Sequence, residues 1–66
     1  MTTEQQAEIR LRDLGGLGEI RVTAWTVDGQ RIFRFATHHD GDDEPGEVFD
    51  VPADSAYRLA IAMLAL

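Results

Sequence analysis

Residues 19–37 read EIRVTAWTVDGQRIFRFAT, and this stretch decides the fold. Apolar and polar residues alternate on both sides of Asp28-Gly29, and alternation with a period of two is typical of half-buried strands. Asp-Gly between two such runs favours a type I′ turn, which requires a positive φ at both central residues. The stretch therefore predicts a β-hairpin with strands over residues 19–27 and 30–37.

A two-residue turn also fixes the register of this hairpin. Ala24 then faces Phe33 and Thr23 faces Arg34, and directly paired residues share a face of the sheet. One face collects only apolar residues, and a slip of one residue would mix the two sets. This face comprises Ile20, Val22, Ala24, Phe33 and Phe35. We expect it to be the core side of the sheet.

Two further runs flank the hairpin. Residues 7–13, AEIRLRD, alternate in the same way, and the glycine-rich segment at residues 14–18 predicts a turn between them and the hairpin. Residues 47–51 are short and rich in apolar side chains, and Pro52 ends the run. We expect residues 47–51 to form a fourth strand at the edge of the sheet.

Helical spacing replaces alternation from Pro52 onward. Proline suits the first turn of a helix, and Asp54 in that turn offsets the free N–H groups and the helix dipole. Apolar residues then recur at helical spacing and predict an inner stripe that faces the sheet. The stripe comprises Ala53, Ala56, Tyr57, Ala60, Ile61 and Leu64.

A second apolar line lies beside this stripe, at Leu59, Met63 and Leu66. A small chain can cover one apolar stripe of its helix with its sheet, but hardly a wide one, and exposed contiguous apolar surface usually marks an interface. We therefore expect a symmetric homodimer that uses Leu59, Met63 and Leu66, the edge of the fourth strand, or both. A curved sheet that wraps the helix within one chain is the alternative.

Together these elements predict an α+β fold, a three- or four-stranded antiparallel β-meander with one C-terminal helix packed on one face. We expect residues 1–6 to be a flexible N-terminal tail and residues 7–66 to be a single small domain. The polar first residues, the lack of cysteine and the short apolar runs favour a soluble, cytoplasmic protein without membrane association.

The outward face of the predicted sheet carries four of the six arginines together with the single tryptophan. These residues are Arg10, Arg12, Arg21, Trp25 and Arg34. Arginine forks bind carboxylates and phosphates, and Trp and Arg are frequent anchors of protein interfaces. We expect this face to bind an acidic protein partner or a second copy of the chain. The alternative is a solvated face on which Glu8 and Glu19 partly pair with the arginines.

A nucleic-acid-binding module that uses the same face is the rival from another functional class. The net charge of −6, the lack of lysine and the single aromatic residue on that face disfavour it, because an RNA-binding sheet normally presents two or three stacking aromatics. A third possibility is that the acids of residues 40–47 mimic nucleic acid or occupy a basic partner site. We expect a small protein–protein interaction or regulatory module that forms a homo-oligomer.

The loop at residues 38–46, HHDGDDEPG, holds the one metal-like cluster. Asp40, Asp42 and Glu44 alternate as calcium ligands can, but the spacing lacks the glycine and the bidentate glutamate of an EF-hand. Nucleophiles are scarce, with one serine, no cysteine and no lysine, and no glycine elbow surrounds Ser55. We therefore expect a protein that is not an enzyme, with no catalytic residues, no metal site and no cofactor.

Overall fold

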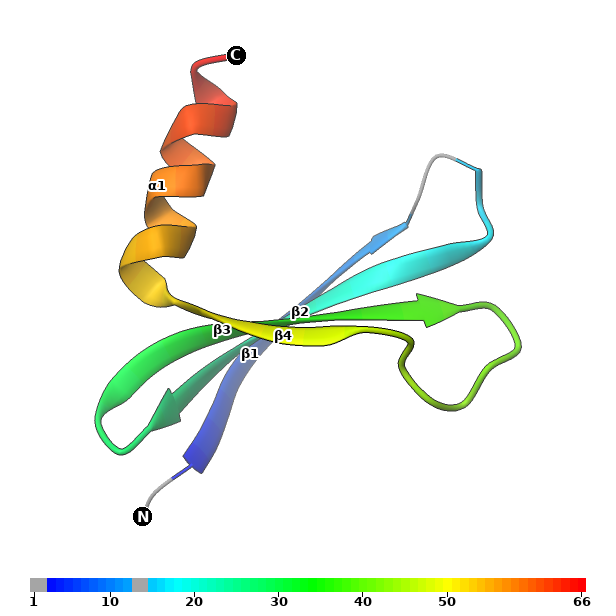
Figure 1. Cartoon of the computed structure of the whole chain (residues 1–66), viewed down its shortest axis with the longest axis horizontal. Helices are drawn as coiled ribbons and strands as arrows, with labels where there is room; N and C mark the ends of the chain where they lie inside the picture. The colour runs from blue at the N-terminus through cyan, green and yellow to red at the C-terminus, as the bar shows by residue number, and fades with distance from the viewer. Residues whose placement is uncertain (1–2, 13–14) are drawn as a thin grey trace.

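The computed structural model describes residues 3–12 and 15–66. Four strands form one antiparallel sheet in chain order: β1 (Thr3–Arg12), β2 (Gly18–Val27), β3 (Gln30–His39) and β4 (Val48–Pro52). One helix, α1 (Ala53–Leu64), follows and packs against β3 and β4 (Figure 1). The predicted α+β meander is therefore confirmed, and its fourth strand pairs with β3 at the edge of the sheet.

The predicted hairpin has the register that a two-residue turn imposes. Ala24 faces Phe33 across β2 and β3, and Trp25 faces Ile32 on the opposite side of the sheet. Asp28 and Gly29 have φ values of 51° and 82°, the positive angles that a type I′ turn requires. The turn chemistry and the alternation therefore determine the centre of the fold.

β1 begins at Thr3, four residues before the alternation that starts at Ala7 in the sequence. Its pairing with β2 shifts between Gln5 and Ala7, as a β-bulge does. The Gln6 side chain accepts hydrogen bonds from the Thr26 hydroxyl at 3.0 Å and from the Arg31 guanidinium at 2.8 Å. Residues 3–6 belong to the sheet, although the sequence assigns them to the predicted tail. The pattern misses them because the bulge breaks the period of two. Residues 1–2 of that tail lie outside the described residues.

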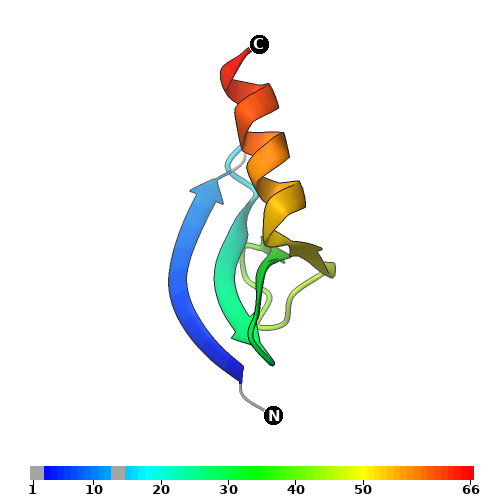
Figure 2. The ribbon, with the colours of Figure 1, turned by 90° about the vertical axis from the view of Figure 1, so that its left-hand side faces the viewer.

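The helix packs on the sheet through its first turns and then leaves it. Pro52 is both the last residue of β4 and the N-cap of α1, so no linker turns the helix back over the strands. Ala53 and Ala56 are half-buried, and the Tyr57 ring meets Phe33 edge-on with ring centroids 5.9 Å apart. The later turns of α1 extend past the ends of the strands (Figure 2).

The predicted inner stripe of the helix therefore reaches the sheet only at its start. Ile61 and Leu64, which helical spacing assigns to that stripe, are 67% and 88% exposed. The expectation that they face the sheet is wrong, because the direct β4–α1 connection directs the helix away from the strands. The Ala60 side chain is likewise exposed.

The resulting molecule is thin and encloses little core. It measures 36 × 34 × 16 Å and has a radius of gyration of 13.2 Å, whereas a compact chain of this length has about 11 Å. Among the described residues, Ala24 is the only buried apolar one, with 3% of its surface exposed. A single sheet with a projecting helix lacks the second layer that normally completes a domain core.

Candidate interaction surfaces

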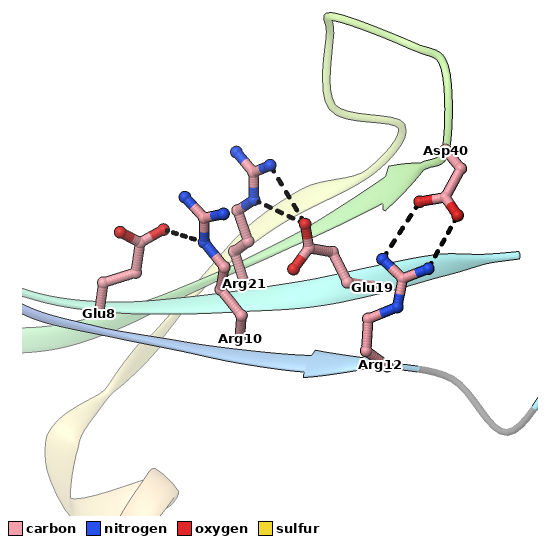
Figure 3. Close-up of polar contacts among 6 residues, drawn as sticks. All are labelled: Glu8, Arg10, Arg12, Glu19, Arg21 and Asp40. Atoms are coloured by element: carbon pink, nitrogen blue, oxygen red, sulfur yellow. Dashed lines mark hydrogen bonds and ion pairs between the residues drawn. The ribbon is translucent and has the colours of Figure 1, made fainter. Parts of the chain in front are cut away.

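The face of the sheet opposite Ala24, here called the arginine face, carries ion pairs. Arg10 lies 3.4 Å from Glu8, and Arg21 lies 3.2 Å from Glu19, each pair within one strand (Figure 3). Arg10 and Arg21 face each other directly across β1 and β2, and like charges in that position repel. The two glutamates offset this repulsion, as the solvated-face alternative predicts from the sequence.

Arg12 joins the arginine face to residues 40–47, here called the acidic loop. Its two terminal nitrogens donate to the two carboxylate oxygens of Asp40 at 2.8 and 3.2 Å (Figure 3). One of them also donates to the carbonyl of Gly16 at 3.3 Å. Hydrogen bonding from Arg12 lowers the pKa of the Asp40 carboxyl below its ordinary value. The first acid of the loop is thus held against the sheet of its own chain.

Arg34 joins the last two strands and covers the tryptophan. It faces Asp50 across β3 and β4, and donates to both carboxylate oxygens at 2.8 and 3.1 Å. This hydrogen bonding raises the pKa of Arg34 and lowers that of Asp50. The Arg34 guanidinium carbon lies 5.3 Å from the centre of the Trp25 ring, and the indole N–H donates to the Thr23 hydroxyl at 2.7 Å.

The five predicted partner-binding residues therefore do share one face, but each arginine contacts a carboxylate of the same chain. Four arginines and four carboxylates sum to zero charge, so the face is neutral where the sequence predicted a basic one. Binding of an acidic partner there stays a prediction, and such a partner must displace an internal carboxylate. Sequence reasoning missed Asp40 and Asp50 as partners. The alternation of Phe49 and Val51 about Asp50 was the available signal, since it places that carboxylate on the polar side of β4.

The other face of the sheet, here called the apolar face, is largely uncovered. Its apolar residues are Ala7, Ile9, Leu11, Ile20, Val22, Ala24, Phe33, Phe35, Phe49 and Val51. The rings of Phe35 and Phe49 stack with centroids 5.2 Å apart. Ile9 and Leu11 on β1 are 59% and 55% exposed, because α1 contacts only β3 and β4.

The last turns of the helix and the two residues that follow it form a second uncovered apolar surface. Residues 59–66, here called the apolar helix end, contain no charged or polar side chain. Its large side chains are all more than half exposed, including the predicted interface residues Leu59, Met63 and Leu66. An amphipathic surface helix normally buries such residues against a neighbour.

The acidic loop is closed at its base by Thr37. The Thr37 backbone N–H donates to the carbonyl of Glu47 at 2.9 Å, and its carbonyl accepts from the Gly46 N–H at 2.8 Å. Its hydroxyl accepts from the Glu47 N–H at 2.8 Å. His38 and His39 line a shallow hollow beside this base. Within residues 3–12 and 15–66, no three His, Asp or Glu side chains converge as a metal site would require.

The surfaces that can contact a partner are thus the neutral arginine face, the apolar face and the apolar helix end. In the described part of the chain, no helix is long and apolar enough to cross a membrane. Comparison of the chain with protein-family models, with curated proteins and with solved structures finds no match.

Proposed function

We propose that this protein is a small, non-catalytic protein–protein interaction or regulatory module that acts as a homo-oligomer. The observation that carries the proposal is the apolar surface left uncovered on both the sheet and the helix. Contiguous exposed apolar patches of this kind usually mark interaction sites. The predicted interface residues Leu59, Met63 and Leu66 all lie in the uncovered apolar helix end.

The accessible surface supports the proposal quantitatively. The chain exposes 5183 Å², whereas a compact monomer of 7.3 kDa exposes about 4,200 Å². The excess is about 1,000 Å², and a standard protein interface buries about 800 Å² on each partner. One interface of ordinary size would therefore remove the excess.

The polar features support an interaction module better than an enzyme or a nucleic-acid binder. Small-molecule sites are usually concave and enclosed, whereas the hollow beside His38 and His39 is shallow and open to solvent, with Glu19 and Glu47 in its lining. The arginine face is neutral and the whole chain is acidic, so long-range attraction to phosphate is weak.

Sedimentation equilibrium at micromolar concentration tests the proposal. We expect a species of twice 7.3 kDa, and we expect Met63→Glu to shift it toward monomer, because a carboxylate is costly to bury in an apolar contact. Ser55→Glu is the matched control, since it places the same charge in the first turn of the same helix. A wild-type chain that stays monomeric throughout this range would contradict homo-oligomerisation.

A further inference from the structure

We infer that the apolar helix end of one copy lies on the apolar face of a second copy, over β1 and β2, and that the second copy returns the same contact. This inference rests on the proposed function and specifies the interface through which it operates.

The first support is that each chain cannot cover its own apolar face. Because Pro52 ends β4 and caps α1 directly, the helix is committed to the β3–β4 side of the sheet and then departs from it (Figures 1 and 2). Ile9, Leu11 and Ile20 on β1 and β2 remain 59%, 55% and 41% exposed. The chain's own helix thus leaves the β1–β2 half of the face without any cover, and it also leaves Phe49 on β4 53% exposed.

The second support is the match in chemistry. Arg58 is the last charged residue of the helix, and every residue from 59 to 66 is apolar. The residues of the apolar face on β1 and β2, from Ala7 to Ala24, are uncharged too. Arg31 lies on the same side of β3, where its guanidinium lies 5.5 Å from the centre of the Phe33 ring and donates to Gln6. Bringing the two surfaces together therefore leaves no charge or polar side chain buried without a partner.

The third support is the match in size. The helical residues from Leu59 to Leu64 rise about 9 Å at 1.5 Å each, and two adjacent strands occupy about 10 Å of sheet width at their usual spacing. The apolar helix end is therefore about as long as β1 and β2 are wide. It completes the second layer that a half-buried sheet normally has.

The fourth support is that two copies can cover each other's apolar surfaces completely, which favours a second copy over another occupant. A dimer through the helices alone would leave both apolar faces bare, and a dimer through the faces alone would leave both helix ends bare. Reciprocal exchange covers both surfaces with one two-fold operation. The excess exposure of about 1,000 Å² per chain is what such an exchange would bury.

Disulfide trapping between two single-cysteine chains tests the arrangement, and the absence of native cysteine makes the background clean. One chain carries Met63→Cys, on the predicted interface line, and a second chain with a mass tag carries Ile9→Cys, Leu11→Cys or Ile20→Cys. All four positions are exposed in one copy, so each variant should fold, which circular dichroism checks. We expect at least one sheet position to form the mixed disulfide, because disulfides form only where Cα atoms come within about 7 Å. Thr23→Cys is the matched control, since Thr23 lies on β2 but on the arginine face.

The outcomes separate this arrangement from its rivals. A mixed disulfide that exceeds the Thr23→Cys control at least tenfold supports exchange. Met63→Cys chains that link mainly to each other would indicate a helix-to-helix dimer and overturn it. So would a dimer by sedimentation in which none of the three sheet positions links to Met63→Cys. A chain that sediments as a monomer would instead refute the proposed function itself, which distinguishes the two failures.

Discussion

Arg34 is expected to stabilise the sheet edge more than its partner Asp50 does. The Arg34 guanidinium makes two separate contacts, a fork with Asp50 at 2.8 and 3.1 Å and a stack over Trp25 at 5.3 Å. Asp50→Asn removes the carboxylate charge and leaves the stack in place, whereas Arg34→Gln removes both contacts. The two substitutions should therefore differ in cost although they break the same ion pair.

The magnitudes follow from exposure. The Arg34 and Asp50 side chains are 41% and 43% exposed, and exposed ion pairs contribute about 0.2–1 kcal/mol. A guanidinium over an aromatic ring contributes about 0.5–1 kcal/mol at exposed sites. Asp50→Asn should thus lower the free energy of unfolding by about 0.5 kcal/mol, and Arg34→Gln by about 1–1.5 kcal/mol. In a domain of this size, 1 kcal/mol corresponds to a melting-temperature shift of about 4–8 °C.

Urea unfolding followed by the fluorescence of Trp25, the single tryptophan, is the assay. All variants are compared at one protein concentration, because subunit association would make stability depend on it. Arg10→Gln is the matched control, since Arg10 makes only a 3.4 Å contact with Glu8 on its own strand, and it should cost less than about 0.5 kcal/mol. Equal costs for Asp50→Asn and Arg34→Gln would refute the contribution assigned to the stack.

The same pair gives a pH dependence with a definite sign. Hydrogen bonding from Arg34 lowers the pKa of folded Asp50, while an unfolded aspartate has a pKa of about 3.9. The stabilisation from this carboxylate is therefore complete above about pH 4 and is lost as the pH falls through the lower folded pKa. Asp50→Asn lacks this titration, so its stability should decline less steeply below about pH 4 than that of the wild type.

Three other outcomes can be measured on the same chain. Gly29→Val should destabilise the fold by about 1 kcal/mol or more in urea, because a β-branched residue resists the φ of 82° although the space around it is open. Gly18→Ala should destabilise the fold by about 1–3 kcal/mol for the opposite reason. The φ of Gly18 is ordinary, but the added methyl would collide with the carbonyl oxygen of His38. A melting temperature equal to that of the wild type would show that β2 and β3 move apart to accommodate the methyl. Calorimetric titration with calcium or zinc should detect no binding at micromolar affinity, about −8 kcal/mol, and tight binding would show that the acids of residues 39–46 converge in solution.

The hairpin could be predicted from sequence because its determinants are local. A two-residue turn leaves one register, and Ala24 and Phe33 then sort with the other apolar residues on one face. The beginning of β1 could not be predicted in the same way. The shift in pairing between Gln5 and Ala7 removes the alternation on which the prediction depends.

The sequence predicted which residues share a surface, but it did not predict the charge or the exposure of those surfaces. Alternation places Arg34 and Trp25 on one face, but the charge of that face depends on Asp50, which comes from another strand, and on Asp40, which comes from a loop. The exposure of Ile61 depends on the direction of the helix, which Pro52 sets by joining β4 to α1 without a linker. Periodicity indicates which residues share one face of a helix or strand. It carries no information about the direction of that element relative to the rest of the fold.

The hydrogen bonds at Thr37 make the acidic loop suitable as an insertion point for protein engineering. Gly46 and Glu47, at the end of the loop, are hydrogen-bonded to Thr37 on β3. Extra residues between Asp42 and Asp43 would therefore lengthen a loop whose two ends are already joined. Each doubling of such a loop costs only about 0.6 kcal/mol. A peptide tag or a labelling sequence placed there would be displayed at one end of the sheet, with strand pairing and both apolar surfaces left as they are.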